Sequence, residues 1–252
     1  MNVILALILF ILMVMVGGEK GARSFIAIFF NFGVLFLTIL FMTHPNANPI
    51  LLTIIACAAI SFISLFFING INVKTITAFM STVITIVLLL LFIFLINKNV
   101  LIQGFGEEEI EDLTVFSLYI GVDFVKIGAS MIIMSTIGAI IDIAISIASP
   151  MREIYAHNTS ITRRELFSAG ISIGRDILGT SANTIFFAFF GSYMALLIWY
   201  KDLSYSFGQI INSKIFSAEM ITIFCAGIGI ALTIPITAAI TAYFLVSRVG
   251  HN

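Results

Sequence analysis

The sequence predicts an all-α, polytopic membrane protein with about seven transmembrane helices, and three observations support this fold class. Hydrophobic residues make up 60% and charged residues 10% of the 252 residues, whereas soluble domains carry about 25% charged residues. The apolar residues fall in long segments, and a helix needs about 20 of them to cross a bilayer. These segments lack the alternation of barrel strands, so helices are expected to satisfy the backbone hydrogen bonds in lipid.

Four segments within residues 1–100 have the character of plain, charge-free transmembrane helices. The first is short, although it extends to Gly18. The basic residues follow this first apolar run instead of preceding it, and no small-residue cleavage site is convincing. We therefore expect a retained helix and not a signal peptide. The four segments are residues 3–16, 25–43, 50–68 and 76–96.

Three further segments in residues 107–252 carry polar groups, so that this half of a single transmembrane domain holds the candidate site. We expect an amphipathic helix at the outer membrane surface over residues 107–123, before the fifth segment. Pro150 is expected to end the fifth helix. The three segments are residues 124–149, 177–200 and 220–247.

A second interfacial helix is expected before the sixth segment. Thr162 and Glu165 have the spacing of a capping box, which predicts a helix start. This helix either enters the membrane directly or breaks near Gly170 or Gly174.

The distribution of Lys and Arg predicts the orientation in the membrane. Cytoplasmic loops are enriched in these residues. One set of loops holds seven of them (Lys20, Arg23, Lys74, Arg152, Arg163, Arg164 and Arg248) and the other holds three (Lys98, Lys201 and Lys214). We therefore expect the N-terminus outside and the C-terminus inside.

Asp142, Arg175 and Asp176 are the candidate functional residues with charge. They lie in or beside apolar segments five and six, where an ionisable group is costly and usually has a function. The topology places them at a similar depth, so an Arg175–Asp142 ion pair is geometrically plausible. The sequence does not decide whether these charges handle an ion or substrate or form a structural pair, nor which Asp takes Arg175.

Polar and small residues surround these charges on one face of each helix. The fifth helix has Ser135, Gly138, Asp142, Ser146 and Ser149 at steps of three or four, and the sixth has Ser172, Asp176, Gly179 or Thr180, and Asn183. Residues at this spacing share a helix face. We expect the two faces to pack together or around a common polar cavity, with Ser146, Thr180 and Asn183 as additional binding candidates.

The seventh helix carries candidate gating residues, Gly227, Gly229 and Pro235. Proline removes a backbone hydrogen bond and can kink a helix. Thr233, Thr237 and Thr241 follow at four-residue steps and have hydroxyls that can cover this loss. These residues indicate either a mobile gate or a discontinuous helix. The alternative is that they serve only helix packing.

Other residues indicate local structure. Asp123 and Lys126 suit an i,i+3 ion pair, Glu219 suits the start of the seventh helix, and Cys57 and Cys225 suit packing positions. No hydrolase, metalloprotease, phosphate-loop or cofactor motif occurs. We expect no enzyme activity and no cofactor, and the net charge of −1 gives no reason to expect nucleic acid as a partner.

Two stretches resemble the signature helices of the bacterial YibE/F-like membrane proteins. They are GAIIDIAISIAS at residues 138–149 and GRDILGT at residues 174–180, the latter followed by Asn183-Thr184. The resemblance spans most of the chain and is sharpest over residues 115–200. It implies a multi-pass protein of the bacterial cytoplasmic membrane, from a family loosely described as permeases, and it falls on the same charged positions.

The expected function is therefore a transporter or permease, or a subunit of one, of unknown substrate. Many relatives carry an extracytoplasmic domain after one N-terminal helix, which this sequence lacks, so we expect it to act beside a longer related subunit or as a homo-oligomer. The alternative is a non-transporting scaffold whose buried charges fix helix packing. A membrane enzyme with two free carboxylates is a third hypothesis.

Overall fold

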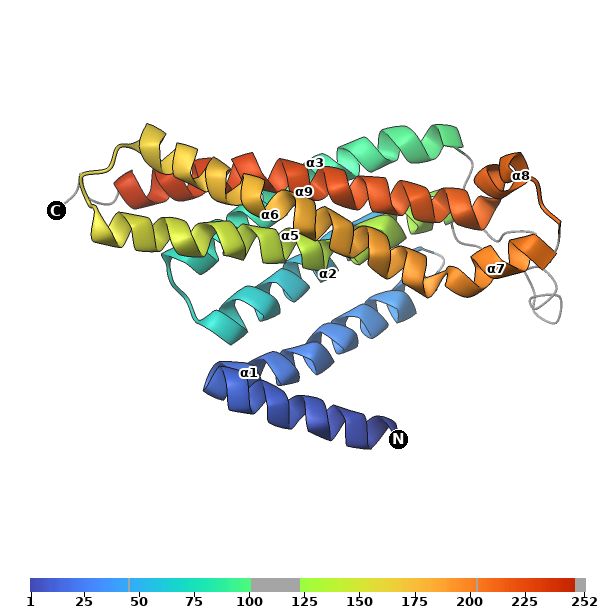
Figure 1. Cartoon of the computed structure of the whole chain (residues 1–252), viewed down its shortest axis with the longest axis horizontal. Helices are drawn as coiled ribbons and strands as arrows, with labels where there is room; N and C mark the ends of the chain where they lie inside the picture. Colours follow the sequence, from blue (N-terminus) through green and yellow to red (C-terminus); the bar gives the residue numbers. More distant parts are fainter. Residues whose placement is uncertain (45, 101–122, 203, 248–252) are drawn as a thin grey trace.

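A computed structural model describes residues 1–44, 46–100, 123–202 and 204–247, and its regular elements there are all helices (Figure 1). Five of the described helices are long and apolar enough to cross a membrane. A sixth span results if the bent pair α6 and α7 is counted as one. The described part of the chain is therefore all-helical, and its long apolar helices are those of a membrane protein. The helix expected over residues 107–123 lies almost wholly outside the described residues.

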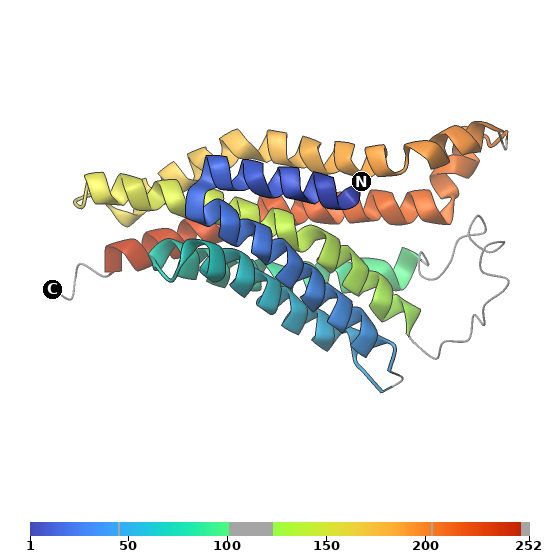
Figure 2. The same ribbon diagram turned by 90° about the horizontal axis from the view of Figure 1, so that it is seen from below.

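The first and second expected segments are the two arms of one helix, α1 (Asn2–Met42), which is broken at Gly18. Gly18 has φ +56°, a left-handed conformation that glycine adopts readily. The second arm turns back past the first (Figures 1 and 2). A Cβ on Gly21 would lie 1.8 Å from the Met13 carbonyl oxygen, so the arms meet at glycine. The Phe10 and Phe25 rings, 5.0 Å apart, close the hairpin.

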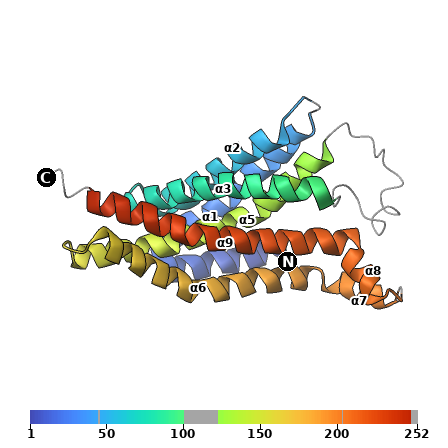
Figure 3. The same ribbon diagram turned by 90° about the horizontal axis from the view of Figure 1, so that it is seen from above.

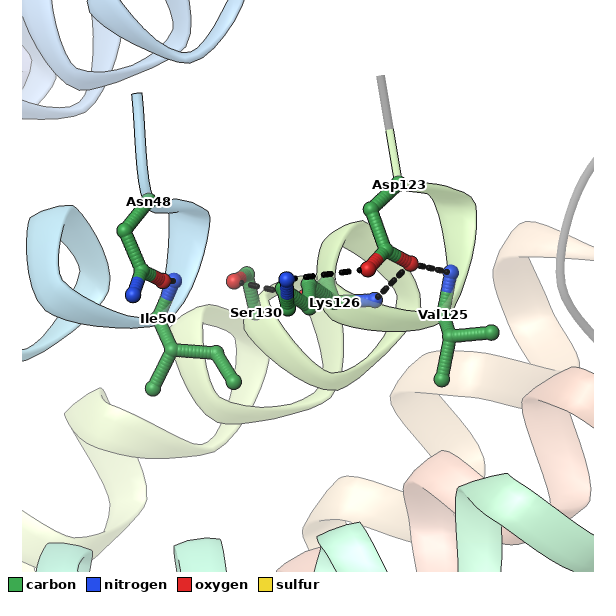
Figure 4. Close-up of polar contacts among 6 residues, drawn as sticks. All are labelled: Asn48, Ile50, Asp123, Val125, Lys126 and Ser130. Carbon is green, nitrogen blue, oxygen red and sulfur yellow. Dashed lines mark hydrogen bonds and ion pairs between the residues drawn. The ribbon is translucent and has the colours of Figure 1, made fainter. Parts of the chain in front are cut away.

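The third and fourth segments form α2 with its continuation η1, and α3. Asn48 caps α2 (Pro49–Phe62) by accepting a hydrogen bond from the Ile50 N–H, and Pro49 suits the first turn (Figure 4). The π-helical η1 (Ile63–Phe67) extends α2, and α3 (Val73–Val100) follows.

The fifth segment is α5 (Phe124–His157), which is longer than expected at its end. At its start, Asp123 accepts hydrogen bonds from the N–H groups of Val125 and Lys126 (Figure 4). The expected i,i+3 ion pair is confirmed, with 3.0 Å between Lys126 Nζ and Asp123 Oδ2. The expected stop at Pro150 is wrong. The helix continues to His157, because proline fits helical φ and here only leaves the Ser146 carbonyl without its intrahelical donor.

The sixth segment begins at the expected capping box. Thr162 and Glu165 bond each other's backbone N–H, and α6 (Arg163–Ser192) then runs unbroken past Gly170 and Gly174. The helix expected before segment six is therefore the first part of α6. The chain bends by 49° between α6 and α7 (Met194–Asp202).

The seventh segment is α9 (Lys214–Ser247), which follows the short α8 (Phe207–Asn212). It starts earlier than expected, so Glu219 lies in the second turn and not at the helix start. There its carboxylate accepts a hydrogen bond from Tyr193, at the elbow between α6 and α7. A small apolar cavity of about 20 Å³ lies beside it, lined by residues of α6, α7 and α9.

Helix α9 occupies the centre of the packing, in contact with α3, α5 and α6 (Figure 3). One apolar cluster joins α2, α3, α5 and α9, and a second joins α5, α6 and α9. Helix α3 and helix α6 run antiparallel to α9, whereas α5 runs parallel to it (Figures 1 and 3). Helix α1 packs on α2 and η1.

Polar side chains connect the helices at the end of the bundle where α1 bends. The Lys74 Nζ donates to Ser149 Oγ over 3.3 Å, which joins α3 to α5. The Arg163 Nη2 donates to Ser247 Oγ over 2.9 Å, and its guanidinium lies 4.9 Å from the centre of the Tyr243 ring. The bend of α1, the start of α3 and the link between α5 and α6 lie at this same end (Figure 1).

Candidate functional site

Asp142 lies on the narrow side of α5 that the bundle leaves uncovered. Between residues 128 and 149, α5 is buried or half-buried except along one stripe. The exposed residues of this stripe are Met131, Ser135, Gly138, Asp142 and Ser146. A lipid-facing helix would expose apolar residues here and bury polar ones. Here the exposed stripe holds Ser135, Asp142 and Ser146 beside Met131, and the buried residues are apolar apart from Ser130 and Thr136.

The polar residues of α6 are also exposed. They recur along the outward side of the helix, whereas Leu166, Gly170 and Gly174 form its buried side. We use the name outer polar surface for ten exposed polar or small residues: Ser135, Gly138, Asp142 and Ser146 of α5, with Ser172, Arg175, Asp176, Gly179, Thr180 and Asn183 of α6.

Packing contacts place the charges of both helices at the same level. A Cβ on Gly229 of α9 would lie 3.3 Å from Ile140 of α5, and one on Gly174 of α6 would lie 2.2 Å from Ile234 of α9. From these two contacts and a rise of about 1.5 Å per residue, Asp142 lies within ~3 Å of the level of Arg175. The expected match in depth therefore agrees with the packing.

The expected packing of the two polar faces against each other does not occur. Helix α6 turns its close-packing glycines toward α9 instead, because Gly170 meets Ala238 and Met151, and Gly174 meets Ile234. The polar residues lie on the other side of α6. In the part of the chain that the structure describes, no ion pair joins Arg175 to Asp142 or Asp176.

The small residues of the outer polar surface face open space. A Cβ on Gly138 or on Gly179 would meet nothing within 4 Å. By contrast, the glycines that face α9 have no such room. These two positions are therefore open in the single chain.

Asn183 and Gly227 lie together in a groove between α6 and α9. The groove has a volume of about 540 Å³ and is open to the outside of the bundle. Its other lining residues are apolar, with Phe186 of α6 and Phe224 of α9 the largest. The structure therefore brings one expected binding residue, Asn183, and one expected gating residue, Gly227, into the same groove. The groove lies at the edge of the outer polar surface.

Pro235 does not interrupt α9, which is one helix over its full length. The proline is exposed, whereas Thr233, Thr237 and Thr241 lie on the buried side. The expectation that threonine hydroxyls cover the lost hydrogen bond is therefore wrong. Thr233 donates to the carbonyl of Gly229, not to that of Ala231, which lacks its donor at Pro235.

The sequence interpretation missed a group of buried hydroxyls on α3. Thr77, Ser81, Thr82 and Thr85 are all 0% exposed, although the first four segments were expected to be plain. The signal was present in the sequence, because residues 77, 81 and 85 recur at four-residue steps, as the threonines of α9 do. Hydroxyls do not interrupt hydropathy as charges do, so the pattern is easy to overlook.

A sequence model of the YibE/F-like proteins matches residues 5–247, which is nearly the whole chain. None of the curated proteins and none of the solved structures matches it. The family match includes both arms of α1, the outer polar surface and α9. The chain therefore belongs to the family of YibE/F-like proteins.

Proposed function

We propose that this protein is a transporter or permease subunit of the bacterial cytoplasmic membrane, in which the outer polar surface forms one wall of a polar pathway. The observation that carries the proposal is the pattern of α5, whose uncovered stripe holds Ser135, Asp142 and Ser146 while its buried sides are apolar apart from Ser130 and Thr136. In this proposal α1 contributes two spans and α6 with α7 one, which gives seven in total. The end that holds Lys74 and Arg163 is cytoplasmic.

The energetic argument concerns the cost of the outer polar surface in lipid. A charged side chain at the centre of a membrane helix costs about 2.5–3.5 kcal/mol on insertion scales. Asp142, Arg175 and Asp176 are exposed together, so bare contact with lipid would cost several times that amount. Water or a second protein chain must therefore cover them. We propose a second copy of this chain, with a longer related subunit as the other arrangement to test.

The residues take distinct roles in this pathway. Asp142 or Asp176 binds the ion or cationic group, and Arg175 is its counter-charge or contacts an anion. Ser146, Thr180 and Asn183 supply neutral hydrogen-bonding groups along the same surface. Gly227 borders the groove beside Asn183. In this proposal the groove is a side entrance from the lipid.

Cysteine accessibility in membranes tests whether water reaches the surface. Cys57 and Cys225 are first replaced by Ala, and Ser146→Cys or Thr180→Cys is introduced. Both new thiols should react rapidly with a charged, water-soluble thiol reagent. The matched control is Leu91→Cys on α3, which is exposed but apolar in its surroundings and should react slowly. Equal, slow reaction at all three positions would refute the pathway.

A second candidate function is favoured by the open space over Gly138 and Gly179. Small residues of this kind allow two membrane helices to approach closely. The protein would then be a scaffold, and the surface a dry contact between subunits. In that case Ser146→Cys and Thr180→Cys stay unreactive to the charged reagent, while Gly138→Cys cross-links efficiently.

A further inference from the structure

Seven buried hydroxyls line the packed sides of α3 and α9. We call them the hydroxyl seam: Thr77, Ser81, Thr82 and Thr85 of α3, with Thr233, Thr237 and Thr241 of α9. Each residue is 0% exposed. None of them belongs to the outer polar surface, which lies on α5 and α6.

The two helices bring these hydroxyls to the same levels of the bundle. A Cβ on Gly229 would lie 3.2 Å from Leu89 Cδ2, which fixes the register of α9 against α3. The helices are antiparallel (Figure 3), so a step forward on one matches a step back on the other. Thr233 is then level with Thr85, and the next turn of each helix brings Thr237 level with Ser81.

Four hydroxyls of the seam have no hydrogen-bond partner: those of Thr82, Thr85, Thr237 and Thr241. This is unusual, because a helical threonine can donate to its own backbone three or four residues earlier. Thr53, Thr136 and Thr222 do so in this chain. A buried hydroxyl without a partner has lost its hydrogen bonds to water and gained none in return. These four hydroxyls therefore destabilise the closed packing of α3 on α9, and water that reached them would supply the missing hydrogen bonds.

Helix α9 has a weak point at the level of the seam. Pro235 lies between Thr233 and Thr237 and removes the backbone hydrogen bond to Ala231. Gly229 precedes Pro235 in α9 and lies at the contact with Leu89. A helix bends most readily where proline interrupts its hydrogen bonds. Bending here moves the hydroxyl-bearing side of α9 relative to α3.

We propose that the hydroxyl seam is the closed form of a polar pathway between α3 and α9, and that its hydroxyls bind water when α9 bends away from α3 at Pro235. This pathway is internal to one chain, and it takes water and small hydrophilic solutes. It deepens the proposed transport function and rests on it, but it uses different residues from the outer polar surface.

The rate at which a cysteine in the seam reacts tests this opening. Ser81→Cys is placed in the chain that lacks Cys57 and Cys225, and its reaction with a small water-soluble thiol reagent is followed in membranes. Thr237→Val is then added. Valine has the same shape as threonine but no hydroxyl. It therefore removes an unpartnered hydroxyl from the closed state and a water-binding group from the open state, and both changes favour the closed state. The rate should fall about fivefold, the factor that corresponds to about 1 kcal/mol.

The matched control is Thr136→Val on α5, in the same Ser81→Cys background. Thr136 is equally buried, but its hydroxyl already donates to the Ile133 carbonyl. This variant should leave the rate unchanged. The proposal is overturned if Ser81→Cys does not react, or if Thr237→Val and Thr136→Val have the same effect. Labelling of Ser146→Cys is measured separately, so failure of the outer pathway and failure of the seam are distinguishable.

Discussion

Asp123 stabilises the start of α5 by capping it and by pairing with a neighbouring cation. Its carboxylate accepts two backbone hydrogen bonds in the first turn and pairs with Lys126. The hydrogen bond from the Lys126 side chain, followed in effect by the backbone bonds and the charge of Lys126, lowers the pKa of Asp123 below its usual value of 3.8. The group lies at the end of the helix and is exposed, so its contribution to stability is small.

The first prediction is a pH-dependent loss of this contribution. A carboxylate whose pKa is lowered by folding stabilises the fold above its unfolded pKa, and this stability is lost as pH falls through the lower folded pKa. Asp123→Asn keeps a good cap but no charge. Wild type should lose thermal stability relative to Asp123→Asn on acidification below about pH 4. Parallel melting curves at all pH values would contradict the assignment.

Prediction from sequence succeeded for single residues where charge or a local motif carried the signal. The Asp123–Lys126 pair and the Thr162–Glu165 capping box need only neighbours three residues apart, and both were found. Arg175 and Asp142 were recognised because charge is costly in lipid. Their outward position was not predictable, because it depends on which side of each helix α9 occupies.

The glycines of α6 differ in their surroundings according to the side of the helix on which they lie. Gly170 and Gly174 face α9 at distances that leave no room for a Cβ, whereas Gly179 faces open space. The sequence shows the glycines but not this difference. The positions of the helices were predictable from hydropathy, whereas the ends at Pro150 and Lys214 and the continuity of α6 were decided by packing and were not.

The second prediction therefore contrasts Gly174→Ala with Gly179→Ala. Alanine at position 174 would place its Cβ 2.2 Å from Ile234 Cγ2, and overpacking of this kind costs about 1–3 kcal/mol. At position 179 the new methyl meets nothing in the single chain, and alanine is the better helix former. Melting in detergent should show a lower melting temperature for Gly174→Ala alone. Equal loss in both variants would show that α6 packs differently.

At the scale of the whole molecule, α3 exposes apolar residues such as Leu91, whereas α5 and α6 expose the outer polar surface. The outer polar surface combines three ionisable groups with two glycines that face open space. The sequence predicted these residues as candidates, and its topology places their charges at a similar depth. It did not show that one chain leaves them uncovered, because helix neighbours are set by long-range contacts.

The third prediction concerns assembly through this surface. Gly138→Cys, in the chain without Cys57 and Cys225, should form a disulfide-linked dimer under mild oxidation in membranes. Leu91→Cys, on the lipid-exposed side of α3, is the control and should stay monomeric. A monomer for both variants, in membranes that contain only this chain, would exclude the second copy. It would leave the longer related subunit as the cover.

The central place of α9 has a consequence for how the protein is made. This helix contacts α3, α5 and α6, yet it is the last described helix to leave the ribosome. The three earlier helices enter the bilayer before the one on which they all pack, and chains form from the N-terminus onward. Until α9 arrives, α3 and α6 lack one of the helices on which they pack, and Gly174 of α6 lacks its contact with Ile234. Completion of the bundle is therefore a late step, which follows insertion of the three helices that pack on α9.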